Sequence, residues 1–243
     1  MVLQWTEGLI CLVAGLIFGA CSLRIWGTSR DKALQLRRAA IANALLWAAV
    51  AAGSWLLALS SAITVMGWMA AGDVARSASA LAWGIAVVPL FYFYGYLILG
   101  EPWEAHLAGA AGVLIFAMGT LALFRAPRAV VEVAEGYRIQ MVEDSLVRGA
   151  VLVVDLVLGA LVSFFLFRIS RELRGLGRWR SILGTCALDA FILSTLVRLA
   201  WQDLAATFAS RLILFASALI LAWGYFLPPR RYLGEGRVGK VQG

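Results

Sequence analysis

Charged side chains are scarce in this 243-residue sequence. Only 14% of its residues are Asp, Glu, Lys or Arg, whereas 62% are hydrophobic. A typical soluble domain has about 25% charged and about 45–50% apolar residues. The apolar residues fall into long blocks, each near the roughly 20 residues that a helix needs to cross a bilayer. The sequence therefore predicts an integral membrane protein.

Residues that bind metals or carry cofactors are also rare. The single histidine, His106, excludes a His-rich zinc site and a haem held by two histidines. The two lysines, Lys32 and Lys240, lie outside the apolar blocks, which excludes a retinal Schiff base. The three cysteines lie inside apolar blocks, where they act as small packing residues. We therefore expect no cofactor, no metal site and no catalytic residue, and a non-enzymatic role is favoured.

Seven apolar blocks are long enough to span the membrane. They cover residues 8–26, 40–60, 80–99, 106–124, 147–167, 182–201 and 206–227. The predicted fold class is an all-α integral membrane protein, with a seven-helix transmembrane domain over 1–229 and a short basic cytoplasmic tail over 230–243. The segment 125–147 alternates apolar and charged residues, so we expect it to lie on the membrane surface or to cap a ligand site.

Basic residues give the predicted orientation. Cytoplasmic loops of membrane proteins are enriched in Lys and Arg. Fourteen of the 21 basic residues follow the first, fifth and seventh blocks, as seven helices require if the N-terminus is outside and the C-terminus is cytoplasmic. The net charge of +7 therefore reflects topology and not a nucleic-acid partner. The default location is a bacterial inner membrane.

Three ionisable residues lie in the predicted outer half of the bundle: Asp155, Arg198 and Arg211. A charge in the middle of a membrane helix costs at least about 2.5–3.5 kcal/mol, so such residues normally face a partner or water. One interpretation is a ligand-binding pocket that is open to the outside. The other is a structural salt bridge between Asp155 and Arg198, with Arg211 reaching the lipid head groups.

A fourth buried charge, Asp189, lies nearer the cytoplasmic side and needs a proton or a hydrogen-bond donor. The third block offers donors in Tyr92, Tyr94 and Tyr96, which follow a predicted kink at Pro89. A tyrosine bonded to Asp189 is one interpretation. In the other, these aromatic residues form an interfacial belt.

Small residues recur at helical spacing in two blocks. Gly15 and Gly19 form a GxxxG pattern, and Gly109 and Gly112 are close together in the fourth block. Such faces allow helices to approach closely. We expect them to pack inside the bundle rather than to form a dimer.

The segment Val88-Pro89-Leu90-Phe91-Tyr92-Phe93-Tyr94-Gly95-Tyr96 ends the third block. Together with the polar segment before the fifth block, the basic loops and the predicted orientation, it resembles the seven-helix sensory regions at the N-terminus of bacterial histidine kinases. The resemblance implies a sensor. In that family the seventh helix leads into a signalling domain, whereas here only a short basic segment follows Pro229, so we expect signalling through a separate partner.

Three functions are compatible with these patterns. The first is a sensor or receptor-like protein that binds a small or lipid-derived ligand and contacts membrane lipid and a protein partner, the latter through its cytoplasmic arginine-rich loops. The second is a structural or accessory subunit of a larger membrane complex. The third is a transporter or lipid-modifying enzyme that uses Asp155, Asp189 and Arg198.

Overall fold

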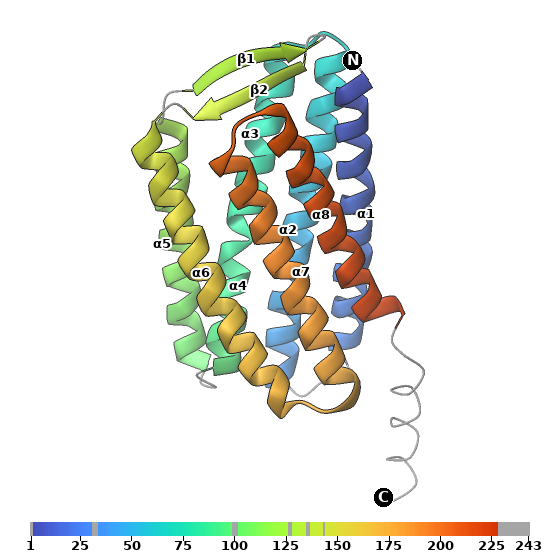
Figure 1. The fold of residues 1–243 in the computed structure, drawn as a ribbon. Helices are drawn as coiled ribbons and strands as arrows, with labels where there is room; N and C mark the ends of the chain where they lie inside the picture. The colour runs from blue at the N-terminus through green and yellow to red at the C-terminus, as the bar shows by residue number, and fades with distance from the viewer. Residues whose placement is uncertain are drawn as a thin grey trace, which may run out of the picture.

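The structure is a computed structural model that describes residues 2–30, 34–98, 102–125, 128–134, 137–142 and 144–227. These residues form a helical bundle with a two-stranded hairpin across one end (Figure 1). The helices are α1 (Val2–Ser29), α2 (Leu34–Val65), α3 (Met69–Ile85), α4 (Val87–Ile98), α5 (Pro102–Arg125), α6 (Ser145–Glu172), α7 (Gly175–Ala200) and α8 (Leu204–Phe226). The strands are β1 (Arg128–Ala134) and β2 (Tyr137–Val142).

Seven helical segments in the described part of the chain are long and apolar enough to cross a membrane, which confirms the predicted count. The third of them runs from Met69 to Tyr96 and contains both α3 and α4. It begins earlier than the predicted block 80–99. Asp73 and Arg76 interrupt the apolar run in the sequence. The helix nevertheless continues through both residues, and their side chains are half-buried in the bundle.

Six of the seven exposed tryptophans in the described residues lie near the two ends of the bundle, and the seventh, Trp55, lies within α2. At the end where α1 begins they are Trp5, Trp68 and Trp201, and at the other end they are Trp26, Trp103 and Trp223. All six side chains are between 42% and 69% exposed. Trp5 and Trp26 are roughly 30 Å apart along α1 at about 1.5 Å per residue, which matches the hydrocarbon thickness of a bilayer. Two such belts are typical of the two water interfaces of a membrane protein.

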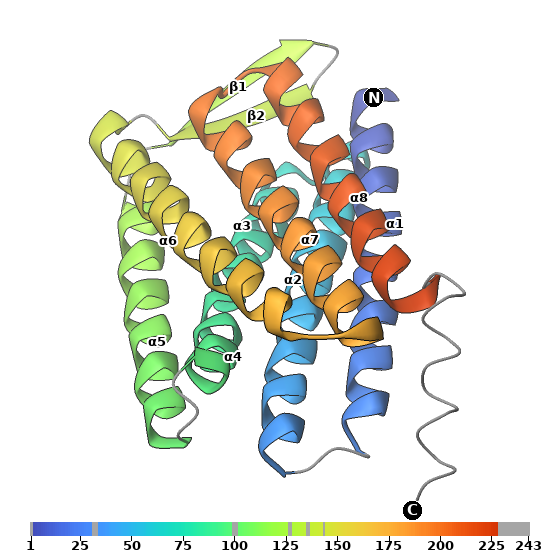
Figure 2. The ribbon, with the colours of Figure 1, turned by 60° about the horizontal axis from the view of Figure 1, so that its bottom comes forward.

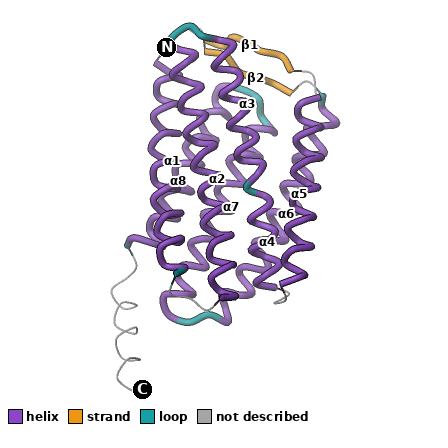
Figure 3. The backbone as a smooth tube through the Cα atoms, turned by 180° about the vertical axis from the view of Figure 1, so that it is seen from behind, coloured by secondary structure: helices purple, strands orange, loops and turns teal. Residues whose placement is uncertain are grey.

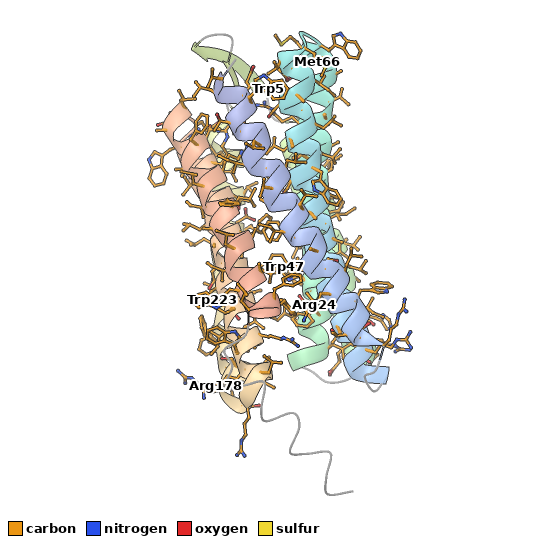
Figure 4. The ribbon with its side chains drawn as sticks, turned by 90° about the vertical axis from the view of Figure 1, so that its right-hand side faces the viewer. Trp5, Arg24, Trp47, Met66, Arg178 and Trp223 are labelled. Carbon is orange, nitrogen blue, oxygen red and sulfur yellow. The ribbon has the colours of Figure 1, made fainter. Side chains whose placement is uncertain are left out.

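The two ends of the bundle differ in charge. The start of α1 and the end of α8 lie at opposite ends (Figure 1). We call the end that carries β1 and β2 the hairpin end. We call the other the arginine end, because it carries Arg24, Arg30, Arg37, Arg38, Arg168, Arg171, Arg174, Arg178 and Arg180. Figure 4 shows Trp5 and Met66 at the hairpin end and Arg24 and Arg178 at the arginine end.

Glycines allow α1 and α2 to pack closely. A Cβ atom on Gly15 would lie 2.5 Å from a ring carbon of Trp55, and one on Gly19 would lie 3.2 Å from the same ring. Deeper in the core, the rings of Phe18 and Trp47 stack with centroids 5.4 Å apart, and both side chains are buried. The GxxxG pattern of α1 therefore packs inside the bundle, as expected.

Serine side chains join neighbouring helices by donating to backbone carbonyl oxygens. The bonds are Ser22 to Ala44 (2.7 Å), Ser60 to Gly72 (2.7 Å), Ser79 to Gly53 (2.7 Å) and Ser217 to Ala187 (2.6 Å). In a membrane, helices are not driven together by the hydrophobic effect, so close packing and such hydrogen bonds hold them. These bonds fix α1 to α2, α2 to α3 and α7 to α8.

The third span is interrupted between α3 and α4 at Ala86, three residues before Pro89, where the kink is predicted (Figure 3). Pro89 has no N–H and its ring crowds the carbonyl group four residues earlier, so the hydrogen-bond ladder of α3 cannot continue into α4. Beyond the break, α4 packs closely on α5. A Cβ on Gly95 would lie 2.8 Å from the Cα of Ala105 and 2.8 Å from the Cβ of Ala108.

The predicted surface segment 125–147 contains an antiparallel hairpin, which the predicted all-α class does not include. β1 pairs with β2 from Arg128 opposite Val142 to Ala134 opposite Tyr137. The alternation of apolar and charged residues indicates a surface segment, but a period of two residues is also the pattern of a strand. The hairpin lies across one end of the bundle (Figures 1 and 3). All seven spans are helical, as predicted, and the predicted tail 230–243 lies outside the described residues.

Candidate functional site

A buried ion pair lies in the half of the bundle nearest the hairpin end. The Nε atom of Arg211 on α8 donates to a carboxylate oxygen of Glu7 on α1 at 2.9 Å. Glu7 is 1% exposed and Arg211 is 7% exposed. The guanidinium carbon of Arg211 also lies 5.7 Å from the centre of the Trp83 ring on α3. This pair therefore links the first and last helices and contacts a third.

Glu7 is not among the site residues predicted from the sequence. The first predicted span begins at residue 8, which leaves Glu7 outside the membrane, whereas α1 begins at Val2 and carries Glu7 into the bundle. The need for charge pairing is the signal in the sequence that could identify Glu7. Arg211 in the last span needs an acidic partner, and Glu7 is the acidic residue nearest the start of the first span.

One of the three residues of the predicted outer pocket has a partner that the sequence analysis did not identify. Arg211 pairs with Glu7 and not with Asp155, because α7 lies between α6 and α8 in the bundle (Figure 2). Asp155 on α6 and Arg198 on α7 are both half-buried. Asp155 makes no ion pair with any residue that the structure describes. Ligand binding at Asp155 and Arg198 stays a prediction.

Asp189 receives its hydrogen bond from a serine rather than from a tyrosine. The hydroxyl group of Ser163 on α6 donates to a carboxylate oxygen of Asp189 on α7. The predicted tyrosine bond is therefore replaced by a bond across the α6–α7 interface.

The three predicted tyrosines have different surroundings. The ring of Tyr92 lies 5.9 Å from that of Tyr96 and 5.4 Å from the imidazole of His106 on α5. Tyr96 is buried in a small cluster with Ala39 and Ala105. These two tyrosines therefore pack α4 against its neighbours. Tyr94 is also buried, but within the described residues its hydroxyl group has no hydrogen-bond partner.

Tyr94 lines a cavity of about 300 Å³ near the arginine end. Its lining residues come from α1, α2, α4, α6, α7 and α8. Much of its wall is apolar and includes Ile25, Leu46, Leu90, Leu166 and Leu188. Its polar lining includes Asn43, Tyr94, Arg180, Ser181, Thr185 and Tyr225. A mostly apolar cavity with a few convergent polar groups is typical of a small-molecule site.

The polar groups of this cavity are partly linked to one another. The side-chain amide of Asn43 donates to the hydroxyl oxygen of Tyr225 at 3.4 Å. The guanidinium carbon of Arg180 lies 5.4 Å from the centre of the Tyr225 ring. Among the described residues, the buried Nε atom of Arg180 has no hydrogen-bond partner. Buried polar groups are usually bonded, so unpartnered donors here favour a bound ligand or water.

This cavity is not among the features predicted from the sequence. The sixth predicted span begins at residue 182, which assigns Arg180 to a loop of arginines, whereas α7 begins at Gly175 and carries Arg180 into the wall of the bundle. Asn43 lies within the second predicted span and is the available signal, because an amide side chain inside a span needs a polar partner.

In comparison with known proteins, no protein-family model matches this chain, and no curated protein matches it at a significant level.

Proposed function

We propose that this chain is a seven-helix sensor or receptor-like protein that binds a small or lipid-derived ligand in the cavity near its arginine end. The cavity is the observation that carries the proposal, because it is largely apolar and has a buried phenol group, on Tyr94, without a partner among the described residues. The proposal moves the expected ligand site from the outer half of the bundle to the half with the arginines.

The arginine end is the cytoplasmic end in this proposal. Arginines are concentrated at this end of the described chain, and loops rich in Lys and Arg are retained in the cytoplasm. The N-terminus is then outside, in agreement with the sequence-based orientation. A bacterial inner membrane is the location that we propose.

A ligand in the cavity would act directly on the turn between α6 and α7. Leu173 and Gly177 both line the cavity, and they flank Arg174 in this turn. Arg171, Arg174 and Arg178 are exposed there. A ligand that binds one spacing of α6 and α7 more tightly than another shifts the population toward that spacing. The turn would thereby present its arginines differently to a cytoplasmic protein partner.

Ligand-dependent stability tests this function. The purified chain is placed in lipid nanodiscs, and thermal unfolding is followed with and without fractions of a membrane lipid extract. A fraction that contains the ligand raises the unfolding temperature, because a ligand that binds only the folded state stabilises it. If no fraction raises the unfolding temperature, the sensor proposal loses its support.

Two tyrosine variants locate the effect. Tyr94→Phe removes the buried hydroxyl group from the cavity and should weaken ligand binding about three- to tenfold, the value of one hydrogen bond. Tyr92→Phe is the matched control, because Tyr92 lies on the same helix but is not part of the cavity wall. Equal loss in both variants would contradict the cavity as the site.

A structural or accessory subunit is the second candidate, and one observation favours it. Two spans have few buried residues. In the most apolar 18-residue stretch of each span, 11% of the residues are buried in Trp103–Leu121 and 18% in Ser145–Glu172, against 44% in the first span. A partner subunit could cover these two helices. This function predicts that other membrane proteins stay bound to the chain after extraction with mild detergent, whether or not any ligand is present.

A further inference from the structure

Two guanidinium groups lie together at the arginine end. The guanidinium carbon of Arg180 lies over Tyr225, and that of Arg24 lies 5.0 Å from the centre of the Phe226 ring, so the two arginines pack on adjacent residues of α8. Neither has a carboxylate partner in the part of the chain that the structure describes.

The cavity beside them has a cationic wall. Arg180 is its one charged lining residue among the residues described. The nearest acidic side chain on the same helix is Asp189, which is not part of the wall and is bonded to Ser163. Asp189 lies roughly 13 Å from Arg180 along the axis of α7 at about 1.5 Å per residue. An anionic group near Arg180 is thus close to a positive charge and distant from the carboxylate of Asp189.

The rest of the wall suits a hydrocarbon chain. Leucine and isoleucine side chains from α1, α2, α4, α6 and α7 surround the space. Its volume of about 300 Å³ is at the lower limit of the range of roughly 300–1,000 Å³ for small-molecule sites. This space accommodates one short chain and a small head group.

We infer that the cavity binds one carboxylate or phosphate group carried on a single apolar chain, with Arg180 binding the anion and the hydroxyl group of Tyr94 donating to the ligand. This inference rests on the proposed function, since it names the chemical class of the ligand at the same site. Charge-assisted hydrogen bonds from a guanidinium group are about twice as strong as neutral ones. Arg180 should therefore contribute most of the selectivity for an anion.

Photo-crosslinking tests the inference directly. The full chain is reconstituted in nanodiscs of phosphatidylcholine, a lipid of zero net charge, and labelled with a dodecanoic acid that carries a photoreactive diazirine. Labelled peptides should come from the cavity walls on α2, α4 and α7. Excess dodecanoate or dodecyl phosphate should prevent the labelling, whereas dodecanol and dodecyltrimethylammonium should not.

Arginine variants identify the group that binds the anion. Arg180→Gln should weaken probe binding about tenfold or more, as expected for a lost bond to a charged group. Arg180→Lys should retain most of the binding because it keeps the charge. Arg178→Gln is the matched control, since Arg178 is an exposed residue of the same helix and is not part of the cavity wall (Figure 4).

A separate arm of the same experiment varies the lipid of the nanodiscs to identify the source of the anion. Phosphatidylglycerol in the nanodiscs prevents labelling if the natural ligand is the head group of a bilayer lipid. If it has no effect while dodecanoate competes, the ligand is a free single-chain anion. Both results support an anion-selective cavity, but competition by phosphatidylglycerol, which carries two acyl chains, would contradict the single apolar chain.

Two results would separate the inference from the proposed function. If dodecanol or dodecyltrimethylammonium competes as well as dodecanoate, or if Arg180→Gln is labelled like the unchanged chain, the anion inference fails but a ligand cavity remains. If labelling occurs only on the lipid-facing surfaces of α5 and α6, both the inference and the proposed site fail. Melting temperatures of all variants exclude unfolding as the cause of a lost signal.

Discussion

The guanidinium group of Arg211 and the carboxylate of Glu7 lie 2.9 Å apart although 204 positions separate them in the sequence. Both are buried, and they join the helix that begins the bundle to the helix that completes it. A buried ion pair adds little net stability against an apolar pair of the same shape, but removal of one partner leaves an uncompensated charge. This asymmetry gives the first prediction.

Glu7→Leu or Arg211→Leu alone should destabilise the folded bundle by about 3–5 kcal/mol, because each removes the 2.9 Å ion pair from a charge that stays buried. The double variant should be more stable than either single variant. Thermal unfolding of the four proteins in nanodiscs measures the difference. Additive losses in the double variant would show that the two side chains do not act as a pair.

Gly15→Ala should destabilise the packing of α1 on α2 by about 1–3 kcal/mol, the usual cost of overpacking. The new methyl group would lie 2.5 Å from the Trp55 ring. Gly27→Ala is the control on the same helix, because a Cβ atom at Gly27 would have no other atom within 4 Å among the described residues. The control should be neutral or more stable, since alanine is the better helix former. Thermal unfolding measures both variants, and an equal response would contradict the close contact with Trp55.

Ser163→Ala should destabilise the α6–α7 interface by about 1–3 kcal/mol, because the carboxylate of Asp189 then loses its donor. Asp189→Asn keeps an oxygen that can accept the same bond and should fold normally.

Uptake assays in vesicles use the Asp189→Asn variant to test whether the chain is a transporter. If Asp189→Asn abolishes the transport of a solute that the unchanged chain carries, the chain is a transporter and the sensor proposal is wrong.

Cysteine labelling in intact cells tests the proposed orientation. A single cysteine at Met66, at the hairpin end, should react with a membrane-impermeant maleimide added outside. A single cysteine at Arg178, at the arginine end, should react only after the membrane is permeabilised. Both positions are exposed (Figure 4), so access to the reagent depends on the side of the membrane. The reverse pattern would place the cavity outside the cytoplasm.

The span count can be predicted because it depends on runs of apolar side chains, and those are local in the sequence. The ends of the spans cannot be predicted in the same way. Asp73, Arg76 and Arg180 each stand outside the predicted spans, yet all three lie in helices. Arg180, for example, packs on the ring of Tyr225 on α8. Such contacts are between residues far apart in the chain.

The candidate site is harder to predict than the fold for the same reason. Arg211 is recognisable in the sequence as a charge within a span, but its partner Glu7 lies on the most distant helix in the sequence. Tyr94 is a plausible donor to Asp189, but Ser163 makes that bond instead. In each case the residue type indicates that a partner is needed, and only the packing of the helices determines which one.

The break at Ala86 divides the third span into α3 and α4, which pack on different neighbours. Ser79 of α3 donates a hydrogen bond to the carbonyl group of Gly53 on α2. α4, which carries Tyr94, packs through Gly95 on the backbone of α5. α3 is therefore fastened to α2, whereas α4 is fastened to α5 and also contacts α2. The place of Tyr94 in the cavity wall thus depends on how α4 packs against both of these helices.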